Sequence, residues 1–219
     1  MKVIITGSTG MVGKGVLLEC LAAEEVTEVL LLNRSPIDIG HPKMKEILLR
    51  DFFDLSEIED QMTGYDACYF CLGISSTGMK EEQYSKITYD LTLNFAQTLI
   101  KKNSDMTFIY VSGQGTSTEM NSKMMWANVK GKTENDLLSL GFKNAYMFRP
   151  GLILPLKGIR SKSWYQIFYD LMKPLYPLFM KSKNITDTER LGKAMINITL
   201  KGSDKQHLEP VDINQLAVG

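Results

Sequence analysis

Short apolar runs alternate with longer segments of helical spacing from the start of the chain to Pro150. The apolar runs predict strands near 2–6, 28–33, 46–50, 66–72, 106–112 and 144–149. The segments between them predict helices near 11–24, 55–62, 80–102 and 121–140. This alternation is typical of a parallel sheet with helices on both faces, joined by right-handed crossovers. The pattern therefore predicts an α/β, doubly wound parallel-sheet domain.

The pattern changes after Pro150, where a loop leads into an aromatic segment over 164–180 and then a helix-like run over 188–200. We interpret 1–219 as a single domain in which 151–219 forms a small C-terminal helical lobe for a substrate or partner. The aromatic segment is expected to pack against the sheet; a wall for an apolar ligand, a partner surface and a membrane-lying helix are the alternatives. Charged residues and prolines interrupt it, so no membrane span is predicted.

Charge and composition narrow the function classes. The 25 acidic and 25 basic residues cancel, so no overall field would attract nucleic acid. We expect an unidentified, apolar small-molecule substrate and leave a protein partner open. The chain runs from Met1 directly into an apolar strand-like run without a signal-peptide pattern, and its cysteines are few and odd in number. These features predict a cytoplasmic protein.

Cys68 and Cys71 form a CxxC pair, which in other contexts is a redox centre or half of a zinc site. The pair lies in a strand-like run, where residues three apart point to opposite faces of a sheet. No second pair of ligands completes a metal site, so we interpret both as buried strand cysteines and expect no metal. His41 and His207 are expected at the surface.

Three glycines, Gly7, Gly10 and Gly13, are spaced GxxGxxG directly after the first strand and directly before an amphipathic helix. In this position the first glycine permits a tight turn, the second lets backbone approach a pyrophosphate, and the third allows close packing of the helix on the sheet. The amides at the start of the helix would face the phosphates. The motif predicts a Rossmann-type nucleotide site made by Gly7, Ser8, Thr9, Gly10, Met11, Val12 and Gly13.

The second strand ends in Asn33-Arg34-Ser35, at the place where NAD-binding proteins carry an acid for the ribose 2′-hydroxyl. No carboxylate stands there. The planar guanidinium of Arg34 is suited to a 2′-phosphate and to stacking beside adenine. We therefore predict that NADP(H) is preferred, with NAD(H) as the alternative.

Further short motifs follow the glycine turn in a recognisable order. They are Asp51-Phe52, Cys71-Leu72-Gly73, Val111-Ser112, Val129-Lys130-Gly131-Lys132 and Arg149-Pro150-Gly151. Together they resemble atypical short-chain dehydrogenases of the NAD-dependent epimerase/dehydratase superfamily, and within them the HIV Tat-interacting oxidoreductase-like branch.

The resemblance covers nearly the whole chain and implies roles for several residues. It implies that Asp51 and Phe52 lie beside adenine and that Cys71, Leu72 and Gly73 pass the ribose and pyrophosphate. It also implies that a further stretch flanks the nicotinamide, namely Pro150, Gly151, Leu152 and Ile153.

Short-chain dehydrogenases reduce carbonyls with a Ser, a Tyr and a Lys, because a hydride arriving on carbon requires a proton on oxygen. Ser112 and Lys130 occupy the Ser and Lys positions, but Trp126 occupies the Tyr position. Indole is a hydrogen-bond donor that cannot deliver a proton at neutral pH. The sequence thus predicts an oxidoreductase with an altered catalytic triad.

Three explanations of the missing tyrosine stay open. The protein is a catalytically inactive NADP(H)-sensing or regulatory interaction protein, or its chemistry has moved, or its reaction needs no tyrosyl acid, as in alkene reduction or isomerisation. Moved chemistry would use Tyr84, Tyr89 or Tyr110 as the proton donor, although packing is the favoured role of each, or Thr116 in place of Ser112.

Overall fold

A seven-stranded parallel sheet forms the centre of the molecule, with the strand order β3-β2-β1-β4-β5-β6-β9. The computed structural model describes residues 1–159, 165–179 and 182–218. The strands of the sheet are β1 (Lys2–Thr6), β2 (Glu28–Asn33), β3 (Met44–Leu48), β4 (Ala67–Phe70), β5 (Thr107–Val111), β6 (Asn144–Phe148) and β9 (His207–Leu208).

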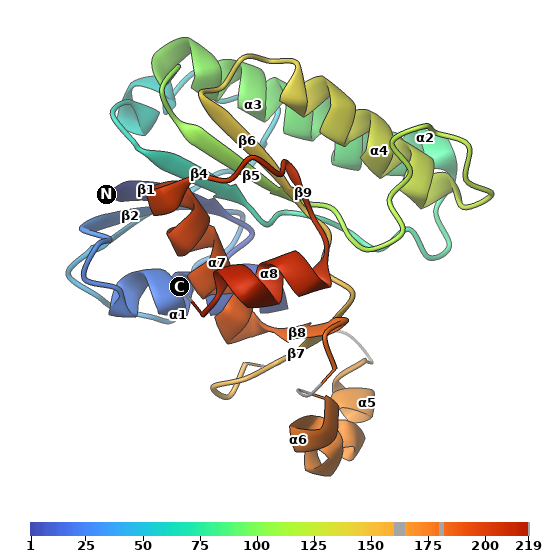
Figure 1. The fold of residues 1–219 in the computed structure, drawn as a ribbon. Coiled ribbons are helices and arrows are strands. Elements are labelled where there is room, and N and C mark those ends of the chain that lie inside the picture. Colours follow the sequence, from blue (N-terminus) through green and yellow to red (C-terminus); the bar gives the residue numbers. More distant parts are fainter. Residues whose placement is uncertain (160–164, 180–181, 219) are drawn as a thin grey trace.

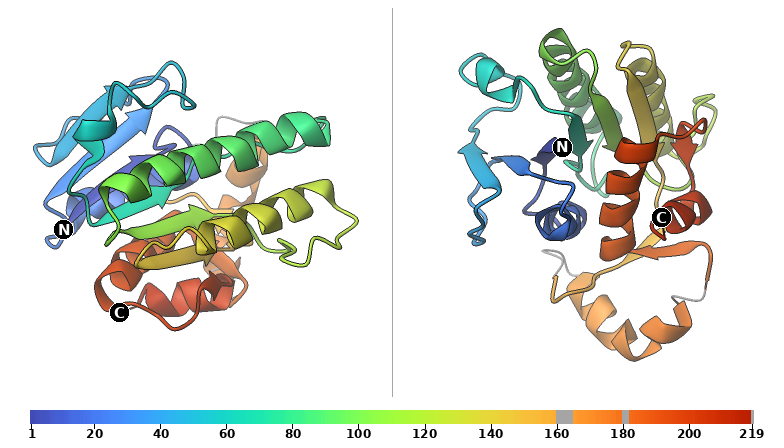
Figure 2. Two further views of the ribbon diagram at one scale, coloured as in Figure 1. Left: turned by 90° about the horizontal axis from the view of Figure 1, so that it is seen from above. Right: turned by 60° about the vertical axis from the view of Figure 1, so that its left-hand side comes forward.

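Helices cover both faces of this sheet, which confirms the doubly wound fold (Figure 1). One face carries α1 (Met11–Ala22), α7 (Thr188–Lys201) and α8 (Pro210–Leu216). The other carries α2 (Glu81–Ser85), α3 (Leu91–Lys102) and α4 (Met125–Leu138). Figure 2 shows the two helical layers from two further directions, with α3 and α4 running side by side.

Each face of the sheet has its own apolar core. Along β1, Val3 and Ile5 belong to the core beneath α1 and α7, whereas Ile4 belongs to the core beneath α3 and α4. This is the alternation expected of a strand buried on both sides. Cys68 and Cys71 likewise fall into opposite cores, and both thiols are free. The interpretation of the CxxC pair as strand cysteines is confirmed.

Two of the predicted helices differ from those observed. Residues 55–62 form only a short 3-10 turn, Glu59–Met62, because Leu55, Ile58 and Met62 anchor an irregular segment into the core. Within 80–102, the π-helical turn Lys86–Asp90 separates α2 from α3. Hydrophobic periodicity alone does not reveal either interruption, because an irregular or π-helical segment buries the same apolar positions as a regular helix.

The link between β2 and β3 contains no helix, and none was predicted there. Pro36, Gly40 and Pro42 lie in this link, and two prolines without amide hydrogens do not continue a helical ladder. The strand expected at 46–50 is β3, and it begins at Met44. Its pairing with β2 runs from Val29 opposite Met44 to Asn33 opposite Leu48.

The segment 151–219 divides into two parts. One part projects from the body (Figure 1) and contains β7 (Leu152–Leu154), α5 (Tyr165–Met172), α6 (Tyr176–Phe179) and β8 (Ile185–Asp187). The other part, α7, β9 and α8, returns to the main sheet and its helical layer. The lobe is therefore smaller than predicted, because β9 is too short to be seen as a strand in the sequence.

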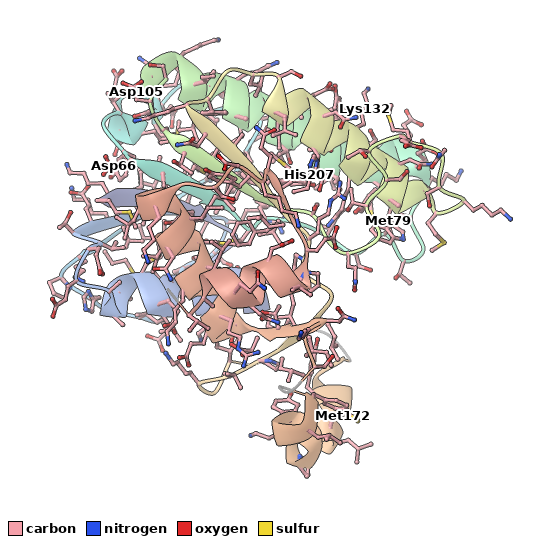
Figure 3. All side chains as sticks on the ribbon, viewed as in Figure 1. Asp66, Met79, Asp105, Lys132, Met172 and His207 are labelled. Atoms are coloured by element: carbon pink, nitrogen blue, oxygen red, sulfur yellow. The ribbon has the colours of Figure 1, made fainter. Side chains whose placement is uncertain are left out.

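Figure 3 shows Met172 in the projecting part, well away from His207 on β9. Trp164 and Met180, at the ends of the aromatic segment, lie outside the described residues. Within the described ranges, none of the helices has the length and apolar character needed to cross a bilayer.

All strands of the main sheet point the same way, so the loops that follow them gather at one edge. In Figure 3, Asp66 and Asp105 precede their strands at the amino-terminal edge, while Met79 lies beyond the opposite, carboxyl-terminal edge. Ligands of open parallel sheets bind at the carboxyl-terminal edge. The candidate site is built there.

Candidate functional site

The turn between β1 and α1 is packed too closely for side chains at two of its glycines. Gly7 has φ +70°, and a Cβ there would lie 2.8 Å from both the Cys71 carbonyl oxygen and the Leu72 nitrogen. A Cβ on Gly13 would collide with the Gly7 carbonyl. The turn therefore packs tightly between the end of β4 and the first turn of α1. Close packing without side chains is what the sequence predicted for both glycines.

Gly10 differs from these two because its position is open. It is exposed, its backbone is extended, and a Cβ there would meet only the Gly7 carbonyl oxygen, at 3.3 Å. Gly10 is also the N-cap of α1, and no side chain caps the helix. The first amides of α1, from Met11 onward, have no side-chain acceptor in the cap, and such amides together with the helix dipole favour an anion.

A cavity of about 310 Å³ opens beside this turn. It brings together residues from the ends of β1, β2 and β4 and one residue, Phe52, from the segment after β3. Its lining is Gly7, Thr9, Gly10, Leu32, Asn33, Arg34, Ser35, Phe52, Cys71, Leu72 and Gly73. Nine of these were predicted as cofactor contacts from the sequence; Leu32 and Ser35 are additional.

The remaining predicted contacts on this side lie outside the lining. Ser8 is fully buried behind the turn, and its hydroxyl donates to Asn33 Oδ1 at 2.9 Å. Met11 and Val12 lie in the first turn of α1. Asp51 is exposed, and its Oδ1 accepts the Phe53 amide at 2.8 Å.

Ser112, directly after β5, lies next to Lys130, in the second turn of α4. The Lys130 ammonium donates to the Ser112 backbone carbonyl. Burial lowers the pKa of Lys130 to about 8, and Glu134 opposes that shift. The loop after Ser112 is held by the Pro150 carbonyl, which accepts the Gln114 amide at 2.9 Å. The predicted catalytic residues and the start of the predicted nicotinamide segment, Pro150–Ile153, therefore share one region.

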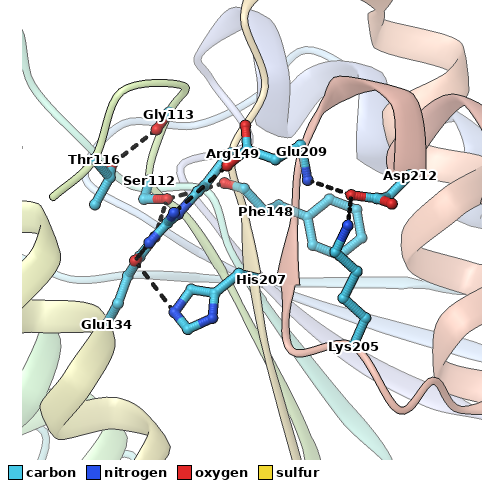
Figure 4. Close-up of polar contacts among 10 residues, drawn as sticks. All are labelled: Ser112, Gly113, Thr116, Glu134, Phe148, Arg149, Lys205, His207, Glu209 and Asp212. Carbon is cyan, nitrogen blue, oxygen red and sulfur yellow. Dashed lines mark hydrogen bonds and ion pairs between the residues drawn. The ribbon is translucent and has the colours of Figure 1, made fainter. Parts of the chain in front are cut away.

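A buried carboxylate beneath Ser112 organises this region (Figure 4). Glu134 is fully buried, and its Oε1 accepts from the Ser112 hydroxyl at 2.5 Å. Arg149 donates to both carboxylate oxygens, through Nε at 3.1 Å and through Nη2. A carboxylate paired in this way is ionised and only accepts hydrogen bonds. The Ser112 hydrogen is therefore directed into the interior.

His207 completes this cluster. The sequence predicted a surface position for it, but the structure shows a half-buried side chain. Its Nε2 lies 3.6 Å from Glu134 Oε2. Burial lowers its pKa, an effect opposed by Glu134 and reinforced by Arg149. His207 stands on β9, the strand that the sequence pattern did not reveal, so its place beside Glu134 had no sequence signal.

None of the alternative proton donors is open in the structure. Tyr84 and Tyr110 are buried in the core, and burial raises the pKa of each. Tyr89 donates to Asp136 at 2.6 Å, and this bond is the largest of the effects that raise its pKa to about 12. The Thr116 hydroxyl donates to the Gly113 carbonyl at 2.7 Å.

Trp126 lies one helical turn before Lys130 on α4 and reaches the loop that follows Ser112. A Cβ on Gly115 would stand 3.5 Å from the edge of the indole ring. Gly115 has φ +89°, a conformation that favours glycine. The indole therefore covers the loop that follows Ser112.

No cluster of three His, Cys, Asp or Glu side chains suited to a metal ion occurs in the part of the chain that the structure describes. Cys68 is fully buried, and burial raises the pKa of Cys71 to about 12.

The fold matches solved structures of short-chain dehydrogenase and epimerase type. The Bordetella bronchiseptica enzyme WbmF in complex with NAD+ matches with a TM-score of 0.72 and 13% identity, over 99% of this chain and 76% of that one. YIR035C, a short-chain dehydrogenase/reductase from Saccharomyces cerevisiae, matches with a TM-score of 0.68 and 13% identity, over 99% and 98%. The chain thus has the Rossmann fold of these proteins.

Comparison of sequences gives more specific relatives than the comparison of folds. FMP52 of Debaryomyces hansenii is 29% identical over 165 residues, which are 74% of this chain and 70% of that protein. HTATIP2 of Rattus norvegicus is 27% identical over 155 residues, 70% of this chain and 63% of that protein. No family model matches the chain. The predicted resemblance to atypical short-chain dehydrogenases and the Tat-interacting branch is confirmed.

The expected cytoplasmic location is contradicted by these relatives. The FMP52 protein of Debaryomyces hansenii is named mitochondrial, and so are three further FMP52 proteins at 28%, 26% and 29% identity. Balanced charge and few cysteines are equally compatible with a mitochondrial protein, which is why composition did not separate the two.

Sequence reasoning missed four side chains of the site: Glu46, Glu134, Arg149 and His207. Arg149 belongs to the motif Arg149-Pro150-Gly151, but the sequence indicated no role for it. Glu134 stands one helical turn after Lys130, so the periodicity of α4 carried a signal for it. Glu46 reaches the end of β2 from β3, and only the sheet places it there.

Replacement of Glu134 by Ala is expected to destabilise the fold by about 3–5 kcal/mol, because Arg149 would keep a poorly solvated charge without its buried partner. The Arg149 side chain is 12% exposed. Chemical denaturation measures the loss. The control is Glu209→Ala, which removes the other partner of Arg149 together with the N-cap of α8, is 41% exposed and should cost about 1–2 kcal/mol. Equal small losses for both variants would contradict the assigned role of Glu134.

Proposed function

We propose that this chain binds NADP(H) at the carboxyl-terminal edge of its sheet and acts as an oxidoreductase with an altered catalytic triad. The observation that carries the proposal is the cavity between the glycine turn and Arg34. Its walls supply an uncapped helix N-terminus for a pyrophosphate and an arginine for a 2′-phosphate. No hydrogen bond or ion pair engages the Arg34 guanidinium within the described residues, so it is available to a ligand.

The shape of the turn supports a dinucleotide. The conformation of Gly7 and the crowding at Gly13 bring backbone amides, without intervening side chains, to the cavity. Ser8 supports the turn from behind and donates to Asn33, which lines the cavity. NADP(H), preferred here over NAD(H), supplies or accepts a hydride when bound.

Lys130 is proposed to hold the nicotinamide ribose, beside Ser112 and the segment that begins at Pro150. Its pKa of about 8 leaves the ammonium mainly protonated at neutral pH. Ser112 is proposed to accept a hydrogen bond from a substrate hydroxyl through a lone pair, because its own hydrogen is engaged by Glu134. The substrate is proposed to be a small apolar molecule.

A second candidate is a catalytically inactive NADP(H)-dependent regulatory or interaction protein. Two observations favour it. Trp126 offers no titratable proton, and the Ser112 hydroxyl donates to Glu134 instead of toward a carbonyl. In this second candidate function the cavity binds NADP(H), and a protein partner distinguishes the NADP(H)-bound form from the free form.

Gly10→Val tests cofactor binding at the helix N-terminus. Because Gly10 is exposed and its backbone is extended, valine should be accommodated by the fold while its branched side chain blocks the pyrophosphate. Titration calorimetry should show loss of both NADPH and NADH binding, while the variant still unfolds cooperatively at a slightly lower melting temperature, because valine is a weaker N-cap than glycine and its Cβ would stand 3.3 Å from the Gly7 carbonyl oxygen. Gly40→Val, at a position with no atom near its Cβ, is the control. Undiminished NADPH binding by Gly10→Val would overturn the proposed site.

Arg34→Ala tests the preference for NADP(H). Loss of a charge-assisted contact to the 2′-phosphate should weaken NADPH about tenfold to a hundredfold and leave NADH affinity unchanged. Arg50→Ala removes an exposed arginine outside the cavity lining and should change neither. Equal affinities of the unaltered protein for NADPH and NADH would refute the preference.

Trp126→Tyr separates the enzyme from the inactive protein. A phenol one turn before Lys130 would restore a general acid, which typically contributes about a hundredfold to ten-thousandfold. NADPH oxidation with reactive diketones and quinones should rise above that of the unaltered protein. Trp126→Phe, which has a ring but no hydroxyl, is the matched control and should give no rise. If neither Trp126→Tyr nor the unaltered protein turns over while both bind NADPH, the second candidate is favoured.

A further inference from the structure

A chain of buried and partly buried hydrogen bonds leads from the glycine turn to a carboxylate on β3. Ser8 is 0% exposed and donates to Asn33 Oδ1, as described above, and Asn33 is 2% exposed. Asn33 Nδ2 donates to Glu46 Oε1 at 2.7 Å. The amide of Ile37 donates to the same carboxylate oxygen at 3.1 Å. Glu46 therefore holds both the end of β2 and the loop that follows it.

Glu46 reaches this place because of the sheet register. It pairs with Leu31 across the parallel β2–β3 ladder, and Leu31 and Asn33 lie on the same face of β2. Position 33 is where an NAD-binding protein of this fold carries its acid. Here the carboxylate arrives from the neighbouring strand and stands behind an asparagine that lines the cavity.

A carboxylate accepts hydrogen bonds and cannot donate them, so it determines which way the Asn33 amide turns. The NH₂ group faces Glu46 and the carbonyl faces the Ser8 hydroxyl, which donates to it. The second amide hydrogen of Asn33 has no acceptor among the residues that the structure describes. Position 33 therefore offers the cavity a donor, next to the cationic Arg34.

We propose that Glu46 is a specificity-determining positioning residue, which by orienting Asn33 and the loop after it makes the site select a 2′-phosphate over a 2′-hydroxyl. The inference rests on the proposed NADP(H) function. Phosphate oxygens at this position only accept, so an N–H beside a guanidinium matches them. The Ile37 contact acts in the same direction, because it holds the turn that carries Arg34 and Ser35.

The negative charge of Glu46 opposes this effect, since it would repel a 2′-phosphate. The carboxylate is not part of the cavity lining, and the Asn33 amide stands between it and the ligand position. We therefore expect the orientation of the Asn33 donor to outweigh the repulsion between Glu46 and the 2′-phosphate. If orientation dominates, loss of Glu46 weakens NADPH binding. If repulsion dominates, loss of Glu46 strengthens it.

The test measures affinities of Glu46→Leu for NADPH and NADH, and for the fragments 2′,5′-ADP and 5′-AMP, by calorimetry. Loss of the acceptor frees the Asn33 amide, so the NADPH-to-NADH affinity ratio should fall about five- to tenfold, with 5′-AMP binding little changed. Lys45→Leu, the same substitution at the preceding exposed position of β3, should leave the ratio unaltered. An unchanged ratio in Glu46→Leu, or tighter NADPH binding, would overturn the proposal.

If Glu46→Leu does not fold, a second variant in which positions 33 and 46 exchange acid and amide provides the test. The double variant Asn33→Asp with Glu46→Gln keeps the net charge and the size of both side chains but moves the carboxylate to position 33. It should prefer NADH and 5′-AMP, with NADPH affinity reduced at least about tenfold. Retention of the NADPH preference would refute the role of Glu46. If the unaltered protein binds no nucleotide, the proposed function fails first and the inference fails with it.

Discussion

The close contact between the β1–α1 turn and the end of β4 is the constraint on which the rest of the site depends. Gly7 in a left-handed conformation lies against the backbone of Cys71 and Leu72, and Gly13 lies against Gly7. Only backbone without Cβ atoms fits this distance. As a result α1 begins at the edge of the sheet with its amides free, and the strand ends beside it form one cavity.

The neighbouring region at the ends of β5, β6 and β9 is held in a different way. Glu134 takes its buried position by bonding to Arg149 on the segment after β6 and to Ser112 after β5. His207 lies against the same carboxylate from β9. Such a network is stable only when its members remain paired, so it fixes the Ser112 hydroxyl more firmly than solvent contact would.

These two regions differ in what they offer a ligand. The cavity beside the glycine turn has an open helix end and an arginine after β2, Arg34. The region around Ser112 and Lys130 has an indole, Trp126, one helical turn before the lysine, and its serine hydrogen is directed inward. This separation underlies both proposed functions, because nucleotide binding at the first region does not require a reaction at the second.

The sequence by itself determined the fold class, the glycine turn and nine of the residues that line the cavity. It could do so because each signal is local: apolar runs mark strands, and glycine spacing marks a turn that excludes side chains. Tertiary structure alone decided the place of β9, of His207 and of Glu46. These depend on which strands become neighbours and in what register, and pairing between segments far apart in the chain leaves no periodic trace in either one. Glu46 is the clearest case, because the sequence shows no acid at the end of β2, whereas the β2–β3 register brings one there from the next strand.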